Sequence, residues 1–185
     1  MSMSSHAQVF FKALCEQIGE KADREGLVRT PERLCEAYQS LLNGYGQNPA
    51  EVLGSVFDEG VCDEMIVLKK MPFYSMCEHH LLPFFGCISL GYIPDKKLAG
   101  ISGLAKVAEI FTHRLQIQEN LTAQIADCLN RELAPKGIMV VCEARHLCLE
   151  MRGKQKQSSI ITSALRGLFK KDSRTRTEFM QLIRD

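Results

Sequence analysis

Apolar residues recur along this chain with the periods of both helices and strands. Near the N-terminus, Phe10, Leu14 and Ile18 recur at every fourth position, which predicts one apolar stripe on a helix over residues 9–22. A second helix is expected to open at Thr30-Pro31 and to stop at the glycines of residues 44–46. These two helices carry no evident chemistry, and we interpret them as an N-terminal helical extension.

Further along, aliphatic runs with alternating polarity predict strands at residues 64–69, 84–94, 138–151 and 158–168. Between the second and third runs, residues 104–133 have a helical period, and a last helix follows residue 173. Antiparallel strands packed with two central helix segments indicate the α+β class. We therefore expect an N-terminal helical region over residues 1–60 and a main domain over residues 61–185.

Composition describes an ordinary globular protein of 185 residues, with 23 Lys plus Arg against 22 Asp plus Glu. The first residues lack the basic and apolar segments of a signal peptide, and the chain has no apolar run long enough to span a membrane. We expect a cytoplasmic protein without a membrane partner, whose eight cysteines are metal ligands or core side chains rather than disulfides.

Basic residues are concentrated between residues 152 and 176. They are Arg152, Lys154, Lys156, Arg166, Lys170, Lys171, Arg174 and Arg176. Such a run is usually a solvated surface, although it is also compatible with an anionic partner. Because no aromatic residues are interleaved to stack on bases, we do not expect a nucleic-acid partner.

Candidate chemistry is concentrated in two short segments. Cys77 and His80 are three positions apart, which lets one turn direct both side chains at a metal ion. In the predicted strand 138–151, His146 and Cys148 would lie on the same face. Cys77, His80 and Cys148 would form a Cys₂His set with an open fourth position, as in catalytic zinc sites, whereas a buried cysteine and a core histidine are the structural alternative. His79 and His146 would remain for proton transfer.

At these residues the chain resembles the GTP cyclohydrolase I family. The resemblance covers roughly residues 30–184 and lies in five segments that follow the family's order: 75–86, 103–106, 116–122, 146–153 and 176–183. It implies a tunnelling fold, in which sheets close into a barrel across subunits, and a homo-oligomer that is usually a decamer of two pentamers. It also makes residues 61–185 the catalytic domain.

The resemblance implies that Zn²⁺ is the cofactor and that GTP is converted to 7,8-dihydroneopterin triphosphate with release of formate. A zinc ion held by two thiolates and an imidazole supplies hydroxide near neutral pH, and this adds to C8 of guanine. In the family pattern His146 protonates N7 of the base, and His79 acts on the ribose ring oxygen. Histidine suits both roles because its ordinary pKa lies close to neutral pH.

Four further residues match the family's substrate-binding positions. Glu119 corresponds to the guanine anchor, with Gln118 beside it, and a carboxylate is a strong acceptor for guanine N–H donors. Without the resemblance, this pair reads as a solvated helix face. Lys106 and Arg152 match residues that bind the triphosphate.

Two positions depart from the family pattern. Ala105 replaces a serine used in the ribose step, and Glu109 stands where the family usually has a phosphate-binding arginine. A shorter stretch after residue 110 would allow His113 or Arg114 to take that place. Two alternatives to the full reaction therefore stay open: a non-catalytic, regulatory paralogue that binds zinc and a purine or pterin, and an enzyme that stops at the formyl intermediate.

Overall fold

The computed structural model of the protein describes residues 3–54, 56–57, 62–152 and 158–184. Its contacts divide the chain into two compact units, Met1–Asn43 and Gly44–Asp185. The predicted boundary at residue 60 falls inside the second unit, because α3 (Pro49–Leu53) packs on α4 (Ile101–Thr112). Lys154 and Lys156 of the basic run lie outside the described residues.

The first unit consists of two helices, α1 (Met3–Ile18) and α2 (Thr30–Leu41), that pack against each other. The structure confirms both predicted helices. The apolar stripe of Phe10, Leu14 and Ile18 is exposed in the single chain. The residue of α1 that is buried is Cys15.

The second unit is built on a five-stranded sheet with the order β5-β2-β3-β6-β7. Its strands are β2 (Ile66–Cys77), β3 (Pro83–Ile93), β5 (Leu115–Gln116), β6 (Gly137–His146) and β7 (Ile160–Gly167). The four long strands are antiparallel neighbours, whereas β5 pairs in parallel with the last two residues of β2. The predicted α+β class is thus confirmed, with one short parallel pair added to the expected antiparallel sheet.

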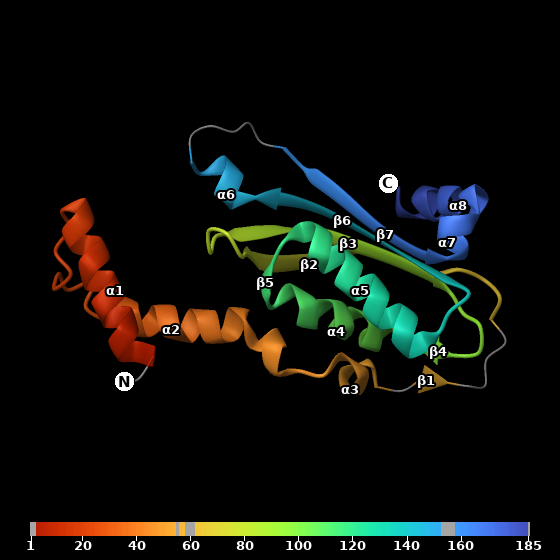
Figure 1. The fold of residues 1–185 in the computed structure, drawn as a ribbon, viewed down its shortest axis with the longest axis horizontal. Helices are drawn as coiled ribbons and strands as arrows, with labels where there is room; N and C mark the ends of the chain where they lie inside the picture. The colour runs from red at the N-terminus through yellow and green to blue at the C-terminus, as the bar shows by residue number, and fades with distance from the viewer. Residues whose placement is uncertain (1–2, 55, 58–61, 153–157, 185) are drawn as a thin grey trace. The chain divides into compact units, whose positions relative to one another are not determined.

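Two central helices, α4 and α5 (Gln118–Leu133), cover one face of this sheet (Figure 1). The segment predicted as largely helical is interrupted at residues 113–117, where the chain forms β5. Phe73 and Phe84 meet edge to face at 5.8 Å beneath these helices. Burying side chains of this size stabilises the fold by about 1.5–3 kcal/mol each. The main hydrophobic core therefore lies between the sheet and these two helices.

The remaining elements are short or lie at the chain's end. They are η1 (Asn43–Gly46), β1 (Val56–Phe57), β4 (Leu98–Ala99), α6 (Leu147–Glu150), α7 (Leu168–Lys171) and α8 (Ser173–Ile183).

On the sheet face opposite α4 and α5, Phe169 and Phe179 form a second cluster. A Cβ on Gly91 would lie 2.6 Å from the Phe179 ring, so this glycine allows α8 to approach the sheet. Within the described residues, no helix is long and apolar enough to cross a membrane.

Candidate metal centre and active site

The first two candidate ligands come from the turn that joins β2 to β3. Backbone hydrogen bonds from Cys77 N to Leu82 O and from Leu81 N to Cys77 O, each 2.9 Å long, close this turn tightly. As a result, Sγ of Cys77 lies 3.8 Å from Nδ1 of His80. Cys77 is buried and His80 is exposed, so the pair lies at the surface end of the sheet.

The third candidate ligand comes from α6, which corrects the prediction of a strand through residue 151. Strand β6 ends at His146, and Cys148 lies in the helical turn that follows rather than on the strand face of His146. Pairing of His146 with Phe84 in β3 brings α6 alongside the β2–β3 turn. Arg145 fixes α6 further, because its guanidinium donates to both carboxylate oxygens of Glu150 at 2.9 and 2.6 Å.

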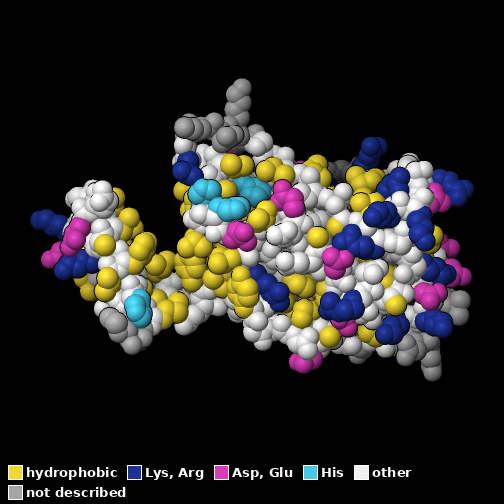
Figure 2. Space-filling model, in the orientation of Figure 1, with side chains coloured by type: hydrophobic (Ala, Val, Ile, Leu, Met, Phe, Trp, Pro, Cys, Tyr) yellow, Lys and Arg dark blue, Asp and Glu magenta, His cyan; other side chains and the backbone are white. Residues whose placement is uncertain are grey.

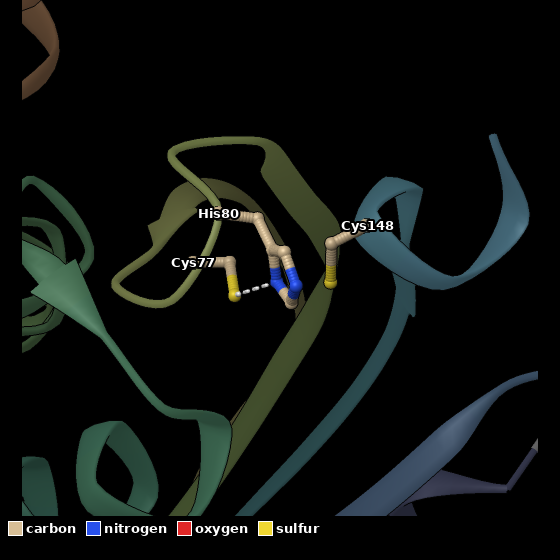
Figure 3. A group of neighbouring side chains, drawn as sticks. All are labelled: Cys77, His80 and Cys148. Carbon is tan, nitrogen blue, oxygen red and sulfur yellow. Dashed lines mark hydrogen bonds between the residues drawn. The ribbon is translucent and has the colours of Figure 1, made fainter. Parts of the chain in front are cut away.

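The ligand atoms of Cys77, His80 and Cys148 all lie within 4.8 Å of one another (Figure 3). Tetrahedral zinc, with bonds of about 2.0–2.3 Å, requires ligand atoms roughly 3.6–3.8 Å apart, so small side-chain movements would suffice. Burial and the neighbouring Cys77 thiol raise the pKa of Cys148, so the thiolate form is disfavoured there. Two thiolates side by side would therefore be stabilised by a bound cation. The three side chains therefore fit a metal ion with two sulfur ligands and one nitrogen ligand.

Two further histidines are close in sequence to the candidate ligands: His79 precedes His80, and His146 is two residues before Cys148. His79 is exposed, and its Nδ1 lies 4.0 Å from Sγ of Cys77. His146 stacks on the buried ring of Phe84, with centroids 4.8 Å apart and an interplanar angle of 2°. Figure 2 shows histidine side chains gathered at one place on the second unit, next to exposed apolar and acidic groups.

Electrostatics around His146 favour its neutral form. Partial burial lowers the pKa of this histidine, whereas the carboxylates of Glu119 and Glu150 act in the opposite direction. Because Glu119 acts on His146, the predicted guanine anchor and the predicted acid lie in one neighbourhood. Glu119 is exposed in the first turn of α5, which leaves its carboxylate accessible to a ligand.

The other predicted substrate residues differ in their surroundings. Gln118 is 1% exposed and is hydrogen-bonded to Nε2 of His146. Arg152 is exposed and close enough to lower the pKa of Cys148, in opposition to burial. Lys106 is exposed on α4, one turn before the exposed Glu109, and its role at the phosphates remains a prediction.

The two basic side chains that follow α4, His113 and Arg114, both have partners within the protein. The guanidinium of Arg114 donates twice to Gly44 O, at 3.2 and 3.0 Å, and lies over the rings of Phe111 and Tyr45. Nδ1 of His113 is 2.9 Å from the carbonyl oxygen of Glu109. Both side chains therefore make contacts at the C-terminal end of α4.

Sequence reasoning missed the support of His146. Phe84, predicted only as a strand residue, stacks on the His146 ring, and the side chain of Gln118 is hydrogen-bonded to Nε2 of that ring. The signal for the second contact was Thr162, which with Ser163 interrupts the apolar run of β7 and lies within hydrogen-bond distance of Gln118.

Two cysteines and one histidine that could hold a metal ion, with two further histidines nearby at the end of an α+β sheet, are typical of the catalytic site of a metalloenzyme. The family model for GTP cyclohydrolase I matches residues 7–184. The chain belongs to the GTP cyclohydrolase I family, as the sequence motifs predict.

Curated relatives match almost the entire chain. GTP cyclohydrolase 1 of Helicobacter hepaticus is 67% identical over 100% of this chain and 93% of its own length. The enzymes of the same name from Wolinella succinogenes and Helicobacter pylori (strain G27) are 58% and 57% identical, cover 94% and 95% of this chain, and are matched over 93% and 98% of their own lengths. A solved archaeosine synthase QueF-like structure matches 54% of this chain and 92% of its own chain, with 16% identity and a TM-score of 0.40.

Proposed function

We propose that this protein is a zinc-dependent enzyme that converts GTP to 7,8-dihydroneopterin triphosphate and releases formate. The observation that carries the proposal is the convergence of Cys77, His80 and Cys148 in a chain of the GTP cyclohydrolase I family. Two soft thiolates and one imidazole are a ligand set that favours zinc over the harder cations. When bound, zinc in such a site supplies an activated water near neutral pH.

The histidines beside the centre provide the proton transfers. A proton given by His146 to N7 of the guanine makes C8 electrophilic, so that water adds there and the five-membered ring opens to a formamide. Hydrolysis of this formamide breaks its C–N bond and releases formate. His79, exposed next to Cys77, acts on the ribose ring oxygen before the new ring closes.

We assign the binding of GTP to residues of α5, of α4 and of the turn that follows α6. The exposed carboxylate of Glu119 accepts hydrogen bonds from the guanine N–H groups, which is a charge-assisted and therefore strong contact. Lys106 and Arg152 contact the triphosphate. Glu109 lies on the same exposed side of α4 as Lys106, and its negative charge weakens this end of the site.

We further propose a cytoplasmic homo-oligomer, a decamer of two pentamers, in which residues 61–185 form the catalytic part. Support comes from the sheet, because β7 is an edge strand that pairs only with β6 among the described residues. An edge of this kind offers backbone groups to a neighbouring copy, which would extend the sheet across subunits.

The proposal is tested by incubating the protein with GTP and zinc and measuring two products. We expect formate and, after oxidation, a fluorescent pterin in equal amounts. Formate without pterin would indicate an enzyme that stops at the formyl intermediate, and Ala105 favours that outcome because the hydroxyl is missing. Neither product would indicate the regulatory paralogue and overturn the proposal.

A further inference from the structure

The side-chain amide of Gln118 is buried and fully used by the protein itself. Its Nε2 donates to the carbonyl oxygens of Cys142 and Ile160, at 3.0 and 2.9 Å, and its Oε1 lies 2.7 Å from Nε2 of His146. With 1% of the residue exposed, the side-chain amide is enclosed by these protein partners. Its role is therefore different from the substrate binding that its place beside Glu119 predicts.

The hydrogen-bond partners determine which position of the Gln118 amide is the oxygen Oε1 and which is the nitrogen Nε2. A flipped amide would place Oε1 against the two carbonyl oxygens of Cys142 and Ile160, which accept hydrogen bonds and cannot donate. The nearby hydroxyl groups agree with this orientation. Thr122 donates to the main-chain oxygen of Gln118 at 2.7 Å, so Thr162 donates to Thr122 at 2.6 Å. The Thr162 oxygen lies 3.2 Å from Gln118 Nε2 and shares its two hydrogens with the two carbonyl oxygens.

The oriented amide determines the hydrogen on the histidine. Because Oε1 of Gln118 can only accept, the hydrogen in its 2.7 Å contact with His146 belongs to Nε2 of the ring. The parallel Phe84 ring holds the imidazole plane, and a half-turn of the ring within that plane would put a carbon in place of Nε2 and lose the contact with Gln118. We propose that Gln118 is a positioning residue, which fixes the hydrogen of His146 on Nε2 and leaves Nδ1 as the nitrogen that exchanges a proton with the substrate.

This inference rests on the proposed function for the reaction it serves. In the proton transfer, the N–H bond at Nδ1 of the imidazolium breaks as the N–H bond at guanine N7 forms. The hydrogen on Nε2 stays with Gln118 in both states, because an amide oxygen can accept from the neutral ring and from the imidazolium alike. Gln118 thus keeps the ring oriented through the whole step.

The direct test is a ¹H–¹⁵N spectrum of the ring nitrogens in protein labelled with ¹⁵N-histidine, without GTP. His146 is assigned by comparison with His146→Ala. We expect a ring N–H signal on Nε2 that is protected from exchange with water, and its loss in Gln118→Leu. A protected hydrogen on Nδ1, or an unchanged signal in Gln118→Leu, would overturn the proposal. If Gln118→Leu does not fold, the wild-type spectrum alone decides between the two nitrogens.

A matched control is Gln116→Leu, since Gln116 is a second buried glutamine whose amide contacts Phe111 O and Gln124 instead of His146. Its variant should keep the protected signal. Thr162→Val should weaken the protection, and Thr162→Ser should restore it, because serine retains the hydroxyl acceptor. An equal effect of Thr162→Val and Thr162→Ser would contradict the assigned hydrogen-bond chain.

Kinetics separate positioning from substrate binding. For a misplaced general acid we expect Gln118→Leu to lower kcat by about 10²-fold, with GTP affinity close to that of the wild type. A large loss of GTP affinity with an unchanged ring N–H signal would instead assign Gln118 to the guanine. Because the spectrum is recorded without substrate, failure of the wild type to release formate would refute the proposed function without changing the result for the hydrogen on Nε2.

Discussion

Removing the metal should destabilise the second unit, because the three candidate ligands join separate elements. Cys77 and His80 come from the β2–β3 turn, and Cys148 comes from α6. In the unfolded chain Cys148 is far from the other two, so the complete set binds metal only in the folded state. With free zinc at about 100 times its Kd, the bound ion should stabilise the fold by about 2.7 kcal/mol.

For a unit of about 140 residues, each kcal/mol moves the unfolding midpoint by roughly 4 °C, so chelation should lower Tm by about 10 °C. The assay is calorimetric unfolding with zinc or with a chelator. Cys148→Ser should lose most of this zinc-dependent shift, because a serine hydroxyl is a poor zinc ligand. Cys128→Ser is the matched control, since Cys128 is a buried thiol on α5 outside the ligand group. A Tm that does not respond to chelation, or a full shift in Cys148→Ser, would refute the assigned centre.

Three further changes probe the chemistry and the fold. His146→Ala should retain zinc but lose formate release by about 10²-fold or more, and unchanged release would show that another group protonates the base. Glu109→Arg should tighten binding of GTP but not of guanosine, most clearly at low salt. The reason is that one pair of like charges at ~4 Å costs about 4 kcal/mol at an effective dielectric of ~20 before screening. Equal GTP affinity in the wild type and the variant would show that Glu109 points elsewhere. Phe179→Ala should lower the free energy of unfolding in urea by about 3–5 kcal/mol, since this fully buried ring packs on Gly91 and Phe169, and a loss below that of Phe179→Leu would contradict the packing.

The long elements could be predicted from the sequence because their apolar residues form either a helical stripe or a run of strand length. Helix α5 has the stripe, whereas strands β3 and β6 are apolar runs whose consecutive residues are buried on both faces of the sheet. Elements of two to four residues carry no such pattern, so β5 and α6 were not foreseen. Cys148 therefore lies on a helical turn where alternation alone predicted a strand.

The candidate metal ligands could be found by residue type, because three of the five histidines lie with cysteines in two short segments of the chain. The contact between Gln118 and Thr162 could not, since the two residues are brought together by the packing of α5 on β7. A glutamine at the start of a helix reads as a solvated residue until its neighbours in space are known. Positioning contacts of this kind depend on tertiary structure and leave almost no local pattern.

The central claim is that the Cys77–His80–Cys148 group binds the ion on which ring opening of GTP depends. The measurement that tests it most directly is formate release by protein depleted of metal and then titrated with zinc. We predict no release from the depleted protein and a rate that rises in proportion to bound zinc up to about one ion per chain. Formate release at the full rate from metal-free protein would contradict the account.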